Sequence, residues 1–267
     1  MALERRAGWH LSPACHAAAT CAMIQVMSDR PVCVIVGAGE GLGRSLAARF
    51  AVGDCDIALV SRTRSGSKAA LEHARAANGS VDVRFFAADA TRPVTVEDAM
   101  ARVAEEMGAI EVLIYNARGD FIRCDPLDMT YAQLEEVFLV EVMGAFAAAR
   151  SVLPAMREKG RGTIMFSSAT AAFRGSATYP LYAIGKFALR ALAQSLAKAH
   201  APDGVHVVHM RLDCDLDVPV MRKLHPDPAS LADPDGVADS YWWVHRQPPS
   251  AWSNEVELRP FSETWTI

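Results

Sequence analysis

The chain has 267 residues, of which 51% are hydrophobic and 22% are charged, and this composition is typical of a globular protein rather than a fibrous or disordered one. The formal net charge of −4 provides no general attraction for nucleic acids or anionic membranes, so we expect neither as a partner. The six cysteines form no CxxC pair, and no apolar run approaches the ~20 residues needed to cross a bilayer. We therefore expect reduced thiols and a cytoplasmic location.

The first 28 residues differ from the pattern that follows them. Arg5 precedes an alanine-rich stretch that faintly resembles a secretory signal, but polar residues interrupt its apolar run. We expect residues 1–28 to be an extension without fixed structure. They could instead be an artefact of the start codon, because Met27 lies just before the first predicted strand. The fold prediction therefore concerns residues 29–267, taken as a single domain.

From Pro31 onwards, patterns typical of strands and helices alternate. Short apolar and β-branched runs predict strands at 32–36, 57–60, 81–87, 110–115, 163–166, 205–210 and 256–258. Helices are predicted from the glycines after the first strand to Arg49, after the second strand to Asn78, and at 94–107, 131–159, 181–199 and 235–245, with a Pro-rich irregular segment before the last of them. Thr130 and Gln133 form a possible capping box for the long helix. Repeated strand–helix units predict an α/β protein with a doubly wound parallel sheet.

A glycine-rich turn joins the first strand to the first helix. Glycines let the backbone turn sharply and approach a pyrophosphate, which then lies against the amide groups at the start of the helix. This placement predicts a Rossmann fold that binds a nucleotide, although other Rossmann-like proteins, such as methyltransferases, use a similar turn. The predicted cofactor-binding residues here are Gly37, Gly39, Glu40, Gly41, Leu42 and Gly43.

The residues at the end of the second strand indicate which nucleotide binds. An acidic residue there would hold a ribose 2′-hydroxyl and favour NAD, whereas a cation accommodates the 2′-phosphate of NADP. Asp54 and Asp56 lie at the other end of this strand, and Ser61 and Arg62 stand at the deciding position. Glu40 disfavours additional negative charge, but the pattern as a whole predicts NADP over NAD.

Tyr182 and Lys186 form a Tyr-xxx-Lys pattern at the start of a predicted helix, which places both side chains on one face. Three other motifs accompany the pair: the glycine spacing at Gly37, Gly41 and Gly43, Asp89 after the third strand, and Asn116-Ala117 at the end of the fourth. Together they resemble the short-chain dehydrogenase/reductase family over residues 31–210.

The resemblance implies an oxidoreductase that interconverts a carbonyl and an alcohol in a small-molecule substrate. Tyr182 would donate or accept the proton at the substrate oxygen, and Lys186 would hold the nicotinamide ribose and ease loss of the phenol proton. Asn116 and Ala117 would support the backbone near the cofactor, and Asp89 would approach the adenine. Family members are commonly homodimers or homotetramers, so we expect such an assembly.

The sequence departs from the family at the position of a serine that normally contacts the substrate oxygen. Counting thirteen residues back from Tyr182 gives Ala169, with Ser168 and Thr170 on either side. Either hydroxyl could serve if the chain bends where the strand ends. We predict Ser168 as the substitute.

Other departures lie nearby. Glu141 stands where the family carries an asparagine, and its carboxylate could pair with Lys186, accept protons, or form a purely structural pair. Arg118 introduces a cation near the expected cleft, where it could contact a phosphate, contact an anionic substrate, or remain on the surface. Leu212-Asp213 replaces the usual Pro-Gly. The acids that follow lack the glycine and glutamate of a calcium loop, so we predict no metal.

Two further functions remain open. A cofactor-binding protein with little or no turnover, acting as a sensor, scaffold or partner subunit, is favoured by Ala169 and Glu141, whereas retention of Tyr182 and Lys186 argues against it. Enoyl reduction or isomerisation by a protein of the same fold is the third possibility.

Overall fold

The computed structural model describes residues 29–263. Seven strands form one sheet in the order β3-β2-β1-β4-β5-β6-β7, and every neighbouring pair is parallel. The strands are β1 (Val32–Val36), β2 (Asp56–Ser61), β3 (Val83–Ala87), β4 (Ile110–Tyr115), β5 (Gly162–Ala169), β6 (Val205–Leu212) and β7 (Glu255–Leu258). Strands β1, β2 and β4 are almost wholly buried, as expected for a parallel sheet covered on both faces. The predicted doubly wound parallel sheet is confirmed.

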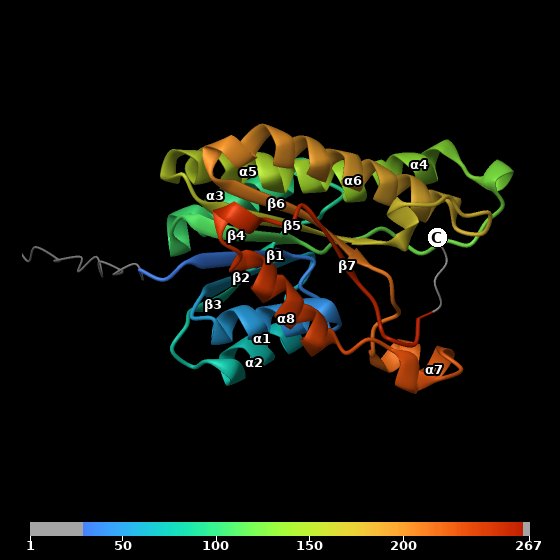
Figure 1. Ribbon diagram of the computed structural model, residues 1–267, viewed down its shortest axis with the longest axis horizontal. Helices are drawn as coiled ribbons and strands as arrows, with labels where there is room; N and C mark the ends of the chain where they lie inside the picture. Colours follow the sequence, from blue (N-terminus) through green and yellow to red (C-terminus); the bar gives the residue numbers. More distant parts are fainter. Residues whose placement is uncertain (1–28, 264–267) are drawn as a thin grey trace, which may run out of the picture.

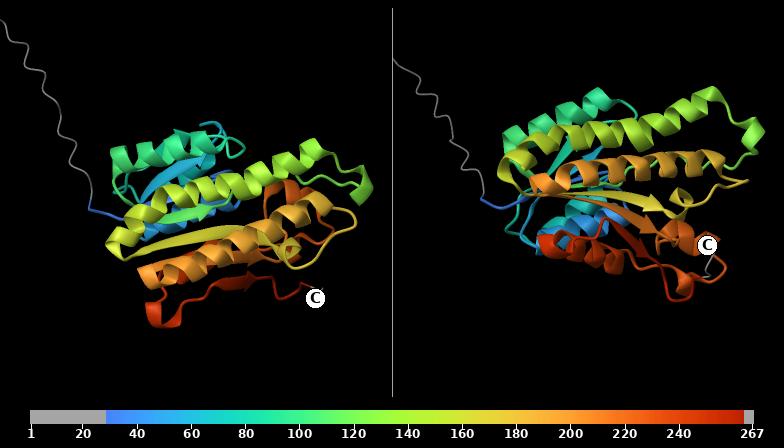
Figure 2. Two further views of the ribbon diagram at one scale, coloured as in Figure 1. Left: turned by 90° about the horizontal axis from the view of Figure 1, so that it is seen from above. Right: turned by 45° about the horizontal axis from the view of Figure 1, so that its top comes forward.

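Helices cover both faces of the sheet, as Figure 1 shows. One face carries α3 (Pro93–Met107), α4 (Tyr131–Phe138), α5 (Gly144–Lys159) and α6 (Pro180–His200), and the other carries α1 (Leu42–Val52), α2 (Lys68–Ala77) and α8 (Pro234–His245). The hydrophobic core is correspondingly split into two clusters, one on each side of the sheet. Figure 2 shows α3, the α4–α5 helix and α6 lying side by side across the first face.

The long helix predicted at 131–159 is present, but it is not regular throughout. The predicted capping box of Thr130 and Gln133 starts α4, and a π-helical turn at Leu139–Met143 then joins α4 to α5. Such a turn contains one residue more than an α-helical turn and frequently occurs at functional sites. The turn therefore changes which side chains of this helix face the sheet.

Several element boundaries also differ from the sequence expectation. The segment expected to be irregular contains a short helix, α7 (Pro219–Leu224), β3 begins two residues later than predicted, and β5 and β6 continue three and two residues beyond their predicted ends. Cys33, Cys55, Cys124 and Cys214 are free thiols. The predictions for residues 1–28, including Cys15 and Cys21, lie outside the described residues.

The sheet order places a topological switch between β1 and β4. The chain proceeds outward from β1 to β2 and β3, then crosses back to form β4 on the opposite side of β1. Helices on the two sides of this point lie on opposite faces, which leaves a crevice at the carboxyl ends of the strands. Open α/β sheets bind ligands in such a crevice.

Candidate active site and cofactor cleft

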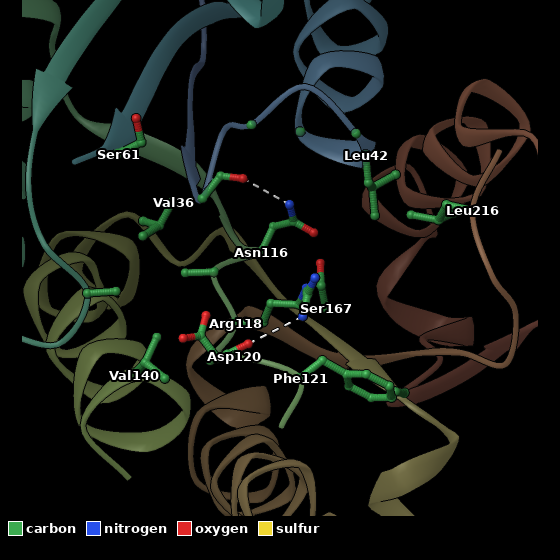
Figure 3. A pocket seen from close by; sticks show the side chains of 18 of the residues that line it. Val36, Leu42, Ser61, Asn116, Arg118, Asp120, Phe121, Val140, Ser167 and Leu216 are labelled. Atoms are coloured by element: carbon green, nitrogen blue, oxygen red, sulfur yellow. Dashed lines mark hydrogen bonds between the residues drawn. The ribbon is translucent and has the colours of Figure 1, made fainter. Parts of the chain in front are cut away.

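A cavity of about 1070 Å³ opens at the carboxyl ends of the strands. The predicted site residues that line it are Gly37, Gly39, Gly41, Leu42, Gly43, Ser61, Arg62, Asp89, Asn116, Ala117, Ser168, Tyr182 and Lys186. Glu40 is exposed and is not among the lining residues. In Figure 3, Ser61 lies at one end of the cavity, Phe121 lies at the other, and Asn116 lies between them. The sequence prediction therefore selected residues that the fold brings together.

Two glycines of the turn after β1 have no room for a side chain. Gly37 has a φ of +87°, and a Cβ there would lie 2.4 Å from the backbone nitrogen of Ala117. A Cβ on Gly43 would lie 2.8 Å from the Cα of Ala38. Because these positions exclude side chains, the backbone turns tightly and presents the start of α1 to the cavity. This arrangement fits a pyrophosphate group.

Asn116 fastens the end of β4 to this turn. Its backbone nitrogen donates to the Val36 carbonyl over 2.7 Å, and its side-chain amide donates to the Gly37 carbonyl over 3.0 Å. Figure 3 shows the side-chain bond. Asn116 therefore fixes the distance between the two strands that border the topological switch.

The end of β2 carries hydroxyl groups and one cation. The Ser61 hydroxyl lies 2.7 Å from the Ser67 hydroxyl and 3.1 Å from the Thr63 carbonyl oxygen. Arg62 is exposed, and within residues 29–263 it forms no ion pair. In the loop after the adjacent strand β3, the Asp89 carboxylate accepts hydrogen bonds from the backbone and hydroxyl of Thr91, which holds it at the cavity wall.

Tyr182 and Lys186 lie on one side of α6, which begins at Pro180. The Lys186 ammonium is 5.6 Å from the centre of the Tyr182 ring. Phe121 stacks on Tyr179 with ring centres 4.0 Å apart and meets Tyr182 edge-on at 4.9 Å. Phe121 and Tyr179 were not predicted from the sequence, and no spacing pattern would have identified this apolar wall.

Lys186 forms a buried ion pair with Glu141. Its ammonium donates to Glu141 Oε2 over 2.8 Å, and the two side chains are 3% and 2% exposed. A weaker contact joins the ammonium to the Ser167 carbonyl oxygen at 3.4 Å. Burial disfavours the charged lysine, but attraction to Glu141, with a contribution from Tyr182, outweighs it and raises the pKa of Lys186. The lysine is therefore an ammonium throughout the neutral range.

The fold holds Glu141 firmly at this position. Glu141 lies in the π-helical turn, and its Oε1 accepts a hydrogen bond of 3.1 Å from the backbone nitrogen of Gly119. Gly185 allows α6 to approach closely, since a Cβ there would lie 2.8 Å from Glu141 Cγ. The adjacent Val140 carbonyl accepts a hydrogen bond from the buried Tyr115 hydroxyl. Glu141 therefore connects the lysine to the loop after β4.

The hydroxyl groups at the end of β5 have different partners. Ser167 is hydrogen-bonded to Tyr241 of α8 over 2.8 Å, and Thr170 donates to the carboxylate of Asp213. Ser168 lines the cavity, is 4% exposed, and has a buried hydroxyl without a partner in the described part of the chain. Of the two hydroxyls considered beside Ala169, Ser168 is therefore the one that no described group engages.

The acidic residues after β6 are largely engaged by arginines. Asp213 accepts from Arg259 as well as from Thr170, and Asp217 pairs with Arg222. Asp215 remains exposed and lines the cavity. Within residues 29–263, no group of three or more potential metal ligands comes together.

Comparison with known proteins identifies the family. The family model described as short chain dehydrogenase matches residues 31–214. The chain belongs to the short-chain dehydrogenase family. A short-chain dehydrogenase/reductase of Armillaria gallica is 29% identical over 184 residues, which cover 68% of this chain and 69% of that protein.

Solved structures of other proteins have the same fold. A short-chain dehydrogenase from Rhodopseudomonas palustris superimposes with a TM-score of 0.74 at 26% identity, covering 86% of this chain and 99% of that one. An alcohol dehydrogenase from the archaeon Thermococcus sibiricus, complexed with 5-hydroxy-NADP, gives a TM-score of 0.79 at 21% identity, covering 90% of this chain and 100% of that one. The second likeness shows the fold alone.

The helix spanning Tyr131–Lys159 is long and apolar enough to cross a membrane by length and composition. In its most apolar window, however, 56% of the residues are buried inside the fold. Its contacts with α3, α6 and the sheet account for this burial, so its apolar composition serves the core.

Proposed function

We propose that this short-chain dehydrogenase is an NADP(H)-dependent oxidoreductase that interconverts a carbonyl and an alcohol. The observation that carries the proposal is that Tyr182, Lys186 and the free hydroxyl of Ser168 line the same cavity as the glycine turn. One end of the cavity therefore suits a pyrophosphate, and the other holds groups that donate protons and hydrogen bonds.

Each residue has a distinct task in this proposal. When bound, the nicotinamide cofactor supplies or accepts the hydride. Tyr182 donates the proton to the substrate oxygen, or removes it in the opposite direction, and Ser168 donates a hydrogen bond to the same oxygen. Two N–H groups of the Lys186 ammonium are directed at Glu141 and the Ser167 carbonyl oxygen, and the third holds a ribose hydroxyl. Phe121 and Tyr179 form an apolar wall beside Tyr182.

The choice of NADP over NAD rests on the end of β2. Arg62 is a cation without a protein carboxylate within residues 29–263, and Ser61 lies beside it with a hydroxyl group. A 2′-phosphate placed there gains charge-assisted hydrogen bonds, while a ribose 2′-hydroxyl finds no acid to accept from it.

The competing proposal is a cofactor-binding protein with little turnover. It is favoured by Ala169 in place of the expected serine and by the engagement of Lys186 with Glu141. Fluorescence titration with NADPH and NADH, followed by a turnover screen over ketones, aldehydes and enoyl thioesters, separates the possibilities. Tight NADPH binding with ketone turnover supports the carbonyl reductase. Turnover of an enoyl thioester supports enoyl reduction instead. Binding without turnover across the panel favours a sensor or scaffold.

We also propose that the protein forms homodimers or homotetramers. Phe138, Met143 and Phe146, on or beside the π-helical turn, are 42%, 47% and 40% exposed in the single chain. Large apolar side chains on one helix are commonly covered by a partner. Size-exclusion chromatography with light scattering would measure the assembly, and a monomer would contradict this expectation.

A further inference from the structure

The ion pair between Lys186 and Glu141 is electrically neutral as a unit and lies directly beside Tyr182. Lys186 stands one helical turn from Tyr182, and its ammonium is 5.6 Å from the tyrosine ring centre. An isolated ammonium at this distance would stabilise a phenolate. The carboxylate 2.8 Å from the same ammonium opposes that effect, because its charge has the opposite sign.

Neither partner has freedom to turn away from the other. Both Glu141 oxygens have donors, Lys186 at Oε2 and the Gly119 backbone at Oε1. Gly185 has no side chain, which lets α6 pack closely against Glu141. An ammonium has three donors, and Glu141 and the Ser167 carbonyl engage two of them. The structure therefore fixes the neutral pair, and one N–H remains available.

Other charged and titratable groups also surround the pair. Arg118 in the loop after β4 opposes protonation of Lys186, and the buried Tyr115 on β4 interacts with both Glu141 and Asp89. His209 on β6 is buried and neutral, because burial lowers its pKa to about 4. The remaining ionisable groups at the cavity wall are Arg62, Asp120, Glu136, Tyr179, Cys214 and Asp215. Among all of these, Glu141 is the carboxylate that contacts the lysine.

We propose that Glu141 is a positioning residue that cancels the charge of Lys186 and keeps Tyr182 in its protonated form at neutral pH, which is the form that donates the proton in carbonyl reduction. This inference rests on the proposed function. In reduction, the carbonyl carbon gains a hydride from NADPH while the carbonyl oxygen gains the phenol proton, and the resulting phenolate regains a proton from water. Alcohol oxidation instead requires the phenolate at the start, as the base that removes the hydroxyl proton.

The test measures ionisation of Tyr182 directly and needs no substrate. Near-ultraviolet phenolate absorbance is titrated against pH, with NADP⁺ present, for the wild type and Tyr182→Phe, and the difference gives the signal of Tyr182. The same difference is then measured between the single variant Glu141→Gln and the double variant that carries both Glu141→Gln and Tyr182→Phe. We expect Glu141→Gln to lower the midpoint of this signal by about one pH unit or more, because one neighbouring negative charge is removed from a site of intermediate polarity.

A matched control removes a carboxylate from the same helix without touching the lysine. Glu135 is exposed on α4 and does not line the cavity, so Glu135→Gln should leave the midpoint unchanged. An unchanged or higher midpoint in folded Glu141→Gln would overturn the inference. So would a shift of similar size in Glu135→Gln. Thermal unfolding and NADPH titration establish that each variant is folded.

The wild type provides a second test that does not depend on the stability of a variant. We expect the phenolate signal of Tyr182 to be absent from the wild type near neutral pH. Detection of the Tyr182 phenolate near neutral pH would overturn the inference that Glu141 cancels the charge of Lys186. Failure of the proposed function has a different signature, because it shows as absent turnover or absent NADPH binding whatever the midpoint.

Discussion

The hydroxyl of Ser167 lies 2.8 Å from the hydroxyl of Tyr241, and both side chains are buried. This bond ties the end of β5 to α8 on the opposite side of the sheet from α6. Ser168, the next residue, has no such partner in the described chain and lines the cavity. The two adjacent serines are therefore expected to differ in function, with Ser167 holding the fold together and Ser168 serving the substrate.

Ser168→Ala should lower turnover by about 10-fold or more while leaving Tm unchanged or slightly raised. The catalytic loss follows from removal of a donor to the substrate oxygen, and stability is spared because the hydroxyl is buried without a partner. Ser167→Ala is the comparison and should lower Tm more and turnover less. Steady-state kinetics and calorimetry measure both effects, and the reverse order would assign the substrate contact to Ser167.

Tyr182→Phe should reduce turnover by about 10²-fold or more without weakening NADPH binding, because it removes the proton donor and retains the ring. Tyr179→Phe, which deletes a hydroxyl from the neighbouring ring of the apolar wall, should have a smaller effect. Kinetics with a ketone found in the screen and fluorescence titration provide the readouts. Unchanged turnover in Tyr182→Phe would contradict its role as acid and base.

Arg62→Ala should weaken NADPH binding by about 10-fold or more and affect NADH little, since a charge-assisted contact to the 2′-phosphate is lost. Arg64 is exposed, lies outside the cavity lining, and provides the matched control. Equal losses for the two cofactors in Arg62→Ala would show that this arginine does not select between them. Equal effects of the two arginine variants would indicate a general electrostatic contribution.

Acid should destabilise the protein in the window between about pH 6.5 and pH 4. Burial lowers the pKa of His209 and of His245 from 6.5 to about 4 in the folded state. The unfolded chain therefore binds more protons at these two sites within this window, and the free energy of unfolding falls as the pH falls through it; the contribution of the two histidines levels off below about pH 4. The loss is on the order of 3 kcal/mol for each histidine. Denaturant unfolding at several pH values measures it.

His209→Leu tests the contribution of one of these histidines. Both ring nitrogens of His209 are buried without partners within residues 29–263, so an apolar residue should preserve stability at neutral pH and flatten part of the acid dependence. His73 is exposed on α2, and His73→Gln should leave the dependence intact. If His209→Leu had the same slope as the wild type, His209 would not be a source of the acid sensitivity.

Local patterns in the sequence were sufficient to predict the sheet and the ends of the cavity. The buried strands follow from β-branched runs, and the cofactor cleft follows from the glycine turn, Asn116 and the Tyr182–Lys186 pair. Each of these signals lies within a few residues or reflects a family motif. The roles of these residues in binding and catalysis stay predictions, and the variants described above test them.

The contacts that shape the substrate end of the cavity could not be predicted in this way. Phe121 meets Tyr179 only after the loop beyond β4 has packed against the start of α6. Ser167 and Tyr241 are far apart in the sequence, and neither residue type signals the other. The π-helical turn that places Glu141 leaves an apolar helical pattern almost unchanged, so periodicity predicts a single helix there.

The order of the strands also bears on how the chain folds while it is being synthesised. Strands β3, β2 and β1 come from the first part of the domain and can pair as soon as they leave the ribosome, but the other edge of β1 has to wait for β4. During this interval an apolar strand with unpaired amides and carbonyls is exposed, and such edges promote aggregation. Translation that pauses before β4 has emerged would prolong this exposure. Such a pause should therefore lower the yield of soluble protein more than a pause placed after β4.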